Sequence, residues 1–183
     1  NYAPTLWPMA SAAAEGFDQI LWLDAQEHTF AEEAGQMNIF FRIGDEVVTP
    51  ELSGTILAGV TRESALKLLE DWGVNAGTRR ISMEELARAS EDGSLLEIFG
   101  AGTAAVIASV ASISYLGKEI SAAPPSNGSL AERLRKTLVS SNSGSRLFTT
   151  GNFSLVLHYV GVSVTGEVVV ALPSGKSGEA MKD

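Results

Sequence analysis

Two adjacent acidic residues, Glu32 and Glu33, precede a glycine and a run of large apolar residues in the stretch TFAEEAGQMNIFF. A carboxylate that is held by partial burial beside a heterocyclic nitrogen favours the protonated form of that ring. One of these acids is therefore a candidate contact for a nitrogen heterocycle. The alternative is that both side chains are solvated surface charges, as most glutamates are.

Two glycine-containing segments have the features of anion sites. Thr61 is predicted to cap the helix over 61–72, and Gly59 precedes it, so that unpaired helix N–H groups and an approachable backbone would meet a phosphate. The segment GAGTAA, Gly100–Ala105, follows an apolar strand and adds the hydroxyl of Thr103 to open backbone amides. A plain helix cap and a tight turn are the alternatives, so neither segment establishes a phosphate site by itself.

The composition restricts the class of protein and its partners. The chain has 183 residues, of which 45% are hydrophobic and 19% charged, as expected of one globular domain with a core. The net charge of −9 disfavours binding to nucleic acid and to anionic membranes. There are no cysteines, which excludes disulfides, thiolate catalysis and cysteine-ligated zinc, and His28 and His158 are isolated. We therefore expect no nucleic-acid, membrane or metal partner.

The pattern of apolar residues and turns predicts an α/β fold of mixed α+β type, with hairpins as well as crossovers. Helices are predicted over residues 5–15, 61–72, 83–89 and 129–140. Strands are predicted over residues 19–24, 37–43, 47–50, 78–82, 95–99 and 106–117, with a tight turn at 100–105. The character of the sequence changes near Ser140. We expect residues 1–140 to form the domain and residues 141–183 to be a divergent, partly disordered tail.

Six ordered motifs resemble those of the branched-chain amino acid aminotransferases. They are NYAP, DQILWLD, EEAGQMNIFF, TPELSGTILAGVTRES, RRISMEEL and EIFGAGTAA. Those enzymes are class IV, fold type IV aminotransferases that use pyridoxal 5′-phosphate. The resemblance covers Asn1 to about Ser140 and implies the large C-terminal domain of such an enzyme, with mixed sheets and hairpins surrounded by helices. It also implies a homodimer that acts on amino acids and 2-oxo acids.

The resemblance implies roles for residues along the cofactor ring. Glu33 matches the glutamate that pairs with the pyridine nitrogen and keeps the ring protonated, so that it can act as an electron sink. Tyr2 matches the tyrosine near the phenolic oxygen of the cofactor, and Leu57 matches the apolar residue that packs against the ring. Glu32 has no counterpart and is interpreted as surface charge.

The resemblance also implies a phosphate site and a substrate contact. Val60 and Thr61 match the pair whose amides, with the threonine hydroxyl, hold the phosphate of the cofactor. Thr103 matches a threonine that also reaches the phosphate and borders the substrate. The amide of its neighbour Ala104 is implied to face the substrate carboxylate.

The sequence departs from the family at several positions. It begins at the Asn of the family's GGNY motif, and none of its lysines matches the Schiff-base lysine, so we expect no catalytic residue of that kind here. The small N-terminal domain, with its phosphate-binding arginine, is not matched. Ala58 stands where the family has proline, and Gln36 stands where a smaller residue is common.

Three interpretations of function remain open. The first is a branched-chain transaminase that moves an amino group between Leu, Ile or Val and 2-oxoglutarate. The second is a D-amino-acid aminotransferase or aminodeoxychorismate lyase on the same scaffold. The third is a truncated, non-catalytic chain that binds the cofactor weakly or pairs with another subunit. We favour the third for the isolated polypeptide and the first for the family. The compartment is expected to be the cytoplasm or the mitochondrial matrix.

Overall fold

The computed structural model describes residues 3–103, 106–122, 129–141 and 153–158. In this part of the chain the helices are α1 (Ala3–Ala14), α2 (Val60–Asp71), α3 (Met83–Glu91) and α4 (Leu130–Ser141). The strands are β1 (Gln19–Leu23), β2 (Ala31–Ala34), β3 (Met37–Ile43), β4 (Glu46–Thr49), β5 (Asn75–Thr78), β6 (Leu95–Gly102), β7 (Val106–Tyr115), β8 (Lys118–Ser121) and β9 (Phe153–His158). The prediction of a mixed α/β fold with hairpins and crossovers is confirmed.

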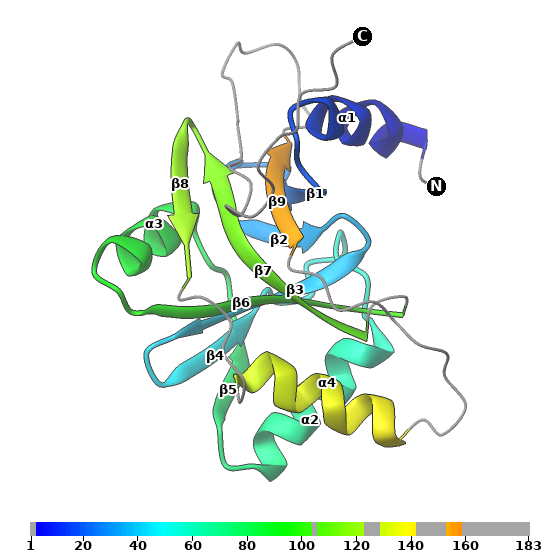
Figure 1. Cartoon of the computed structure of the whole chain (residues 1–183), viewed down its shortest axis with the longest axis vertical. Helices are drawn as coiled ribbons and strands as arrows, with labels where there is room; N and C mark the ends of the chain where they lie inside the picture. The colour runs from blue at the N-terminus through cyan, green and yellow to red at the C-terminus, as the bar shows by residue number, and fades with distance from the viewer. Residues whose placement is uncertain (1–2, 104–105, 123–128, 142–152, 159–183) are drawn as a thin grey trace, which may run out of the picture.

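The strands curl into a closed circuit. β1 pairs with β2, β2 with β3, β3 with β6 and β6 with β7, all antiparallel, and β9 joins β7 back to β1 with parallel pairing on both sides. β4 and β5 extend the sheet from β3, and β8 pairs with the far end of β7. Figure 1 shows β9 between β1 and β7, with α2 and α4 together on one side of the sheet and α3 beside β8.

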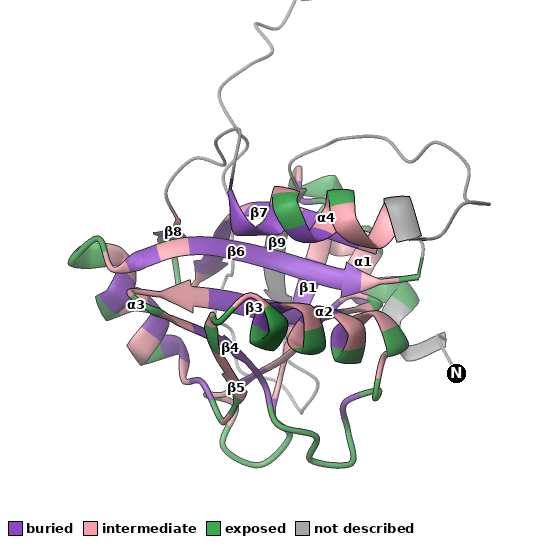
Figure 2. Ribbon diagram, turned by 90° about the horizontal axis from the view of Figure 1, so that it is seen from below, coloured by how far each residue is buried: buried purple, intermediate pink, exposed green. Residues whose placement is uncertain are grey.

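Strand β3 is buried on both of its faces and joins two hydrophobic cores. Ile39 and Phe41 face the core that α3 helps to cover, whereas Phe40 faces the core beneath α2 and α4. The ring of Phe40 stacks on that of Phe99 in β6, with centroids 5.0 Å apart. Figure 2 shows β6 as buried along most of its length. This two-sided burial explains the apolar run in the middle of β3, because residues 38–41 are buried whichever face they point to.

The N-terminus of α4 is anchored to the sheet by a buried acid, Glu97 of β6. Its Oε1 atom accepts a hydrogen bond from Leu130 N and its Oε2 atom accepts one from Ala131 N, both at 3.0 Å. Arg42 of β3 donates to the same carboxylate at 3.0 Å. A negative charge at a helix N-terminus is favourable because it meets unpaired N–H groups and the positive end of the helix dipole.

The structure corrects two predicted elements and adds a strand. The predicted strand over 78–82 is wrong, because the strand β5 ends at Thr78 and Arg79 instead forms ion pairs with Glu46 and Glu85 at 2.9 and 2.7 Å. The predicted turn at 100–105 is too long, since β6 continues through Gly102. Strand β2, which carries Glu32 and Glu33, is not among the predicted strands.

One segment of the predicted tail, Phe153–His158, forms β9 within the circuit. Ser141 ends α4, and the other residues of the predicted tail, 142–152 and 159–183, lie outside the described residues together with the rest of the predicted SNSGS linker at 141–145. The boundary at residue 140 therefore stays a prediction. Among the helices of the described residues, none is long and apolar enough to cross a membrane.

Candidate functional site

Glu33 lies on β2 opposite Asn38 of β3, and its carboxylate is held from one side. The Oε1 atom accepts a hydrogen bond from Leu57 N at 2.7 Å and a longer one from Asn38 Nδ2 at 3.3 Å. No residue in the described part of the chain donates to Oε2. A carboxylate accepts at both oxygens, so Oε2 remains available to the N–H group of a ligand.

The pKa of Glu33 is raised above its usual range. Burial is the main cause, because it penalises the charged carboxylate, and the neighbouring charge of Glu32 acts in the same direction. The hydrogen bond from Leu57 N opposes both effects. A cation beside Oε2 would remove much of this penalty, so the electrostatics of the position favour a positively charged partner.

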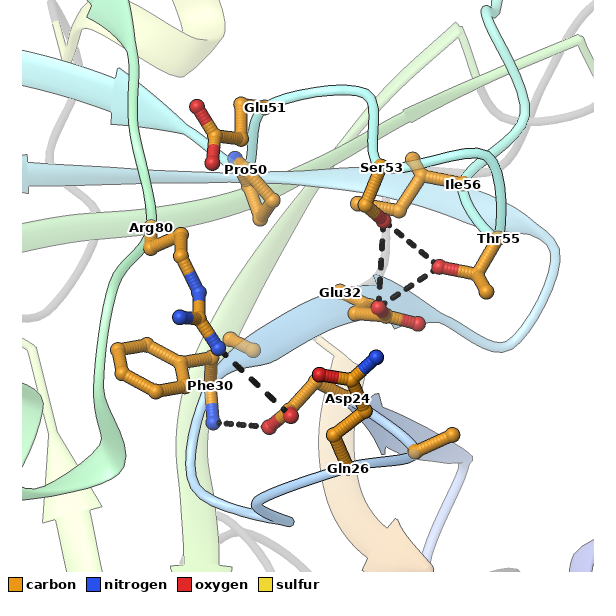
Figure 3. A pocket seen from close by; sticks show the side chains of 12 residues that line it. Asp24, Gln26, Phe30, Glu32, Pro50, Glu51, Ser53, Thr55, Ile56 and Arg80 are labelled. Carbon is orange, nitrogen blue, oxygen red and sulfur yellow. Dashed lines mark hydrogen bonds and ion pairs between the residues drawn. The ribbon is translucent and has the colours of Figure 1, made fainter.

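Glu32 points to the opposite side of β2 and lines a separate pocket, shown in Figure 3. Its Oε1 atom accepts hydrogen bonds from Thr55 Oγ1 at 2.7 Å and Ser53 Oγ at 3.4 Å. Arg80 closes another part of this pocket, with its guanidinium 3.6 Å above the ring of Phe30. Glu32 is thus half-buried and bonded to the loop after β4, where the sequence predicted a solvated charge.

Helix α2 begins directly after this loop and presents its N-terminus beside Leu57. Gly59, and not Thr61, is the N-cap residue, with no side-chain hydrogen bond to the cap. Val60 and Thr61 are the first helical residues, whose N–H groups have no partner within a helix. Leu57 and Val60 are 71% and 80% exposed, so both residues are accessible to a ligand.

Arg62 lies beneath this helix end and adds positive charge to it. The residue is 6% exposed, and its Nη2 atom donates to Pro50 O at 2.9 Å. Its Nε atom is buried without a hydrogen-bond partner in the described part of the chain. Burial lowers the pKa of Arg62, but an arginine stays charged at neutral pH. The guanidinium therefore reinforces the preference of the helix terminus for an anion.

Thr103 follows the end of β6, which lies beside the start of β3. Ala101 pairs with Asn38, and a Cβ on Gly102 would lie 2.9 Å from Met37 Cγ, so β6 runs closely past the start of β3. Thr103 is exposed just beyond this contact. Glu33, Leu57 and the start of α2 are joined by short contacts, and β6 leads Thr103 toward them. Tyr2 and Ala104 lie outside the described residues.

The sequence interpretation gave no role to Asn38 or Arg62. Asn38 is 6% exposed and donates to Leu57 O at 2.8 Å as well as to Glu33. The signal for Asn38 was a polar residue inside the apolar run MNIFF, because a buried amide requires partners. The corresponding signal for Arg62 was absent, since arginine in the first turns of a helix is ordinary on a surface.

The described site residues fit a flat heterocycle that is protonated at one end and anionic at the other. Glu33 offers a carboxylate oxygen for a ring N–H, and the start of α2 offers N–H groups and positive charge for an anion. Leu57 presents an exposed apolar side chain between them. Within the described residues no group of His, Cys, Asp and Glu could hold a metal ion.

Residues 1–113 match the family model described as amino-transferase class IV, and the chain therefore belongs to that family. Among curated proteins it is similar to branched-chain-amino-acid transaminase 1 of Bacillus subtilis (strain 168), with 46% identity over 138 residues, which cover 75% of this chain and 39% of the relative. It is 42% identical to branched-chain-amino-acid aminotransferase 2 of the same organism over 144 residues, 79% of this chain and 40% of that one. The chain thus spans about 40% of the length of these relatives.

Solved structures show the same fold. The branched-chain amino acid aminotransferase from Escherichia coli superposes with a TM-score of 0.62 at 24% identity, over 76% of this chain and 43% of that one. A second branched-chain amino acid aminotransferase, the T.th. enzyme with pyridoxamine 5′-phosphate, gives a TM-score of 0.61 at 27% identity, over 78% and 43% of the two chains. The prediction of the fold type IV aminotransferase architecture is confirmed.

Proposed function

We propose that this chain forms the cofactor-binding part of a branched-chain amino acid transaminase that uses pyridoxal 5′-phosphate. The observation that carries the proposal is the geometry of Glu33, whose Oε1 atom is bound by Leu57 and Asn38 while Oε2 is left for a ligand. Its support comes from the family of the chain and from a neighbour whose structure contains pyridoxamine 5′-phosphate.

The proposed contacts divide between the ring and the phosphate. Pyridoxal phosphate, when bound, supplies an electron sink for carbanion chemistry at the amino-acid substrate. Glu33 would hold the proton at the pyridine nitrogen, Leu57 would pack on the ring, and Tyr2 would lie near the phenolic oxygen. The raised pKa of Glu33 suits this role, because a charged ring nitrogen stabilises the carboxylate that burial destabilises.

The phosphate would meet the amides of Val60 and Thr61, with the hydroxyls of Thr61 and Thr103 completing the contacts. A helix N-terminus binds a phosphate well because its N–H groups and dipole act together. We further propose that the amide of Ala104 faces the substrate carboxylate.

The proposed reaction moves an amino group between Leu, Ile or Val and 2-oxoglutarate, and the proposed assembly is a homodimer. The branched-chain names of the relatives favour this substrate class over a D-amino acid or aminodeoxychorismate. No lysine of this sequence matches the family's covalent lysine, so we propose that the isolated polypeptide binds the cofactor without turnover.

Equilibrium binding of pyridoxal phosphate tests the proposal. We expect saturable binding by the purified chain, at least tenfold weaker in Glu33→Ala, since the variant loses a charge-assisted hydrogen bond to the ring. The exposed Glu119 of β8 provides the matched control, and Glu119→Ala should bind as the unmodified chain does. No saturable binding, or equal loss in both variants, would contradict the proposed site.

Borohydride reduction followed by mass spectrometry tests the absence of a covalent lysine. We expect no stoichiometric adduct on any lysine of the chain after reduction with bound cofactor, and no product from leucine and 2-oxoglutarate. A single lysine labelled in full, together with turnover, would show that the isolated chain is a complete catalyst.

A further inference from the structure

We infer that Asn38 is a positioning residue that locks Glu33 and Leu57 into one unit for cofactor binding, and that Gly59 is required because it leaves space for Asn38. This inference rests on the proposed function and extends it to two residues that are not among the cofactor and substrate contacts proposed above. It arises from the contacts between β3, β2 and the loop before α2.

The amide of Asn38 lies at the centre of a closed set of hydrogen bonds. Its Nδ2 atom donates to Leu57 O at 2.8 Å and to Glu33 Oε1 at 3.3 Å, while Leu57 N donates to the same Oε1 atom at 2.7 Å. Both backbone polar groups of Leu57 are thus bound by side chains. The position of Leu57 depends on Glu33 and Asn38 rather than on a regular ladder.

Gly59 has a spatial reason to be glycine. Its φ of −73° is available to any residue, so conformational freedom does not require glycine here. A Cβ atom at this position would collide with Oδ1 of Asn38, and the next nearest atoms, Asn38 Cγ and Arg62 Cβ, lie 3.4 and 3.7 Å away. Asn38 is 6% exposed on a two-sided strand and has little space to withdraw. The glycine is therefore explained by the Asn38 amide.

The lock affects the chemistry of Glu33 through its orientation. Two donors bind Oε1 and restrain the orientation of the carboxyl group. Oε2 accepts no hydrogen bond from a described residue and is left for a ligand. Loss of the Asn38 donor would remove one of these restraints and favour protonation of the half-buried carboxyl group. A protonated, rotating carboxyl group holds a ring nitrogen proton poorly.

A double-mutant cycle tests the space argument. Gly59→Ala should lower the unfolding midpoint of the full chain and speed exchange of the Leu57 amide at least tenfold, because Asn38 is displaced. In the Asn38→Ala background the amide oxygen is gone, so adding Gly59→Ala should leave exchange of the Leu57 amide unchanged and should lower the midpoint only by the small cost of alanine at the N-cap of α2. Equal and additive effects of Gly59→Ala in both backgrounds would overturn the inference.

The protonation state of bound cofactor tests the positioning role. Pyridoxal phosphate labelled with 15N at the ring should show a protonated nitrogen in the unmodified chain, and a shift toward the neutral form with at least tenfold weaker binding in Asn38→Ala. Thr49→Val is the matched control, since Thr49 is 1% exposed and its Oγ1 atom donates to Ile39 O in the backbone of β3, at 2.7 Å, and not to Glu33 or Leu57. It should lower stability without changing the 15N signal.

The outcomes separate the inference from the proposed function. An unchanged 15N signal and affinity in Asn38→Ala would overturn the positioning role while leaving the cofactor site intact. If the unmodified chain binds no cofactor, the proposed function fails, and the positioning role for cofactor binding falls with it. The double-mutant cycle and the Leu57 amide exchange then still decide whether Asn38 and Gly59 form the lock.

Discussion

At the scale of single residues, adjacent positions on a strand have opposite environments. Glu32 and Glu33 are neighbours in sequence, but the alternation of a β-strand sends them to opposite sides of β2. Glu32 binds the hydroxyls of Thr55 and Ser53, whereas Glu33 binds Leu57 and Asn38. Both acids therefore hold the loop before α2, from opposite sides of β2.

Glu33→Gln should remove a pH-dependent loss of stability in the cofactor-free chain. The pKa of Glu33 is raised in the folded state. Its contribution to the free energy of unfolding is therefore complete below pH 4.5, the ordinary pKa, and is lost as the pH rises through the higher pKa of the folded state. Glutamine keeps an acceptor for Leu57 N and does not titrate. The free energy of unfolding of Glu33→Gln relative to the parent should increase between pH 4 and pH 7 in urea titrations. A pH-independent difference would contradict the assignment.

Asp24→Asn should show the opposite dependence on pH. Burial alone would raise the pKa of Asp24, but hydrogen bonds from the backbone of Glu27, Phe30, Thr29 and Gln26 outweigh burial and lower it. The ionised Asp24 thus stabilises the folded state at pH values above its ordinary pKa of 3.8. This stabilisation is lost as the pH falls through the lower pKa that Asp24 has in the folded state. We expect Asp24→Asn to cost about 1–2 kcal/mol at pH 6. Urea titrations should show this cost shrinking at pH 3, and a constant cost would be inconsistent with the carboxylate's role.

At the scale of elements, helix α4 depends on one buried carboxylate. Glu97→Ala would leave the first two N–H groups of α4 without acceptors and Arg42 without its ion-pair partner. We expect a loss of about 2–3 kcal/mol in the free energy of unfolding, because buried unpaired donors keep their desolvation penalty. Exposed Glu91→Ala at the end of α3 is the control. Chemical denaturation measures both, and equal effects would refute the anchoring role.

The elements that were predicted well from the sequence have a clear pattern of apolar residues. The apolar run of β3 and the helical spacing of α2 and α4 give the correct elements within a residue or two, because local pattern and burial agree. The missed strand β2 has the sequence AEEA, and β5 has NAGT. Neither sequence favours a strand. Both become strands through pairing, β2 with the strands before and after it and β5 with the more distant β4.

The candidate site was predictable only where a motif carried it. Glu33 and the start of α2 follow from the family resemblance, and the structure joins them through Leu57. The need for glycine at position 59 comes from the collision that a Cβ atom there would have with Asn38. The hydrogen bond from Asn38 to Leu57 joins residues 19 positions apart, and no local sequence pattern encodes either contact. Arg62 was missed because nothing in a helical sequence marks a buried guanidinium.

At the scale of the whole molecule, β9 completes the circuit of strands. It pairs in parallel with β1 on one side and with β7 on the other. Without it, β1 and β7 would each present an edge with unpaired N–H and C=O groups toward the gap, which invites pairing with other chains. A segment beyond the family match at residues 1–113 thus closes the sheet that carries the candidate site.

Removal of residues 142–183 should therefore destabilise the chain, whereas removal of residues 159–183, which keeps β9, should not. Loss of the β1–β9 and β7–β9 ladders removes several hydrogen bonds, each with a net contribution of about 0.5–1.5 kcal/mol. A total loss of about 3 kcal/mol would lower the thermal midpoint by roughly 6–12 °C in a chain of this size. The exposed edges should also increase self-association, which light scattering after size-exclusion chromatography measures against the shorter deletion. Matching midpoints and matching masses in the two deletions would show that β9 does not hold the circuit closed.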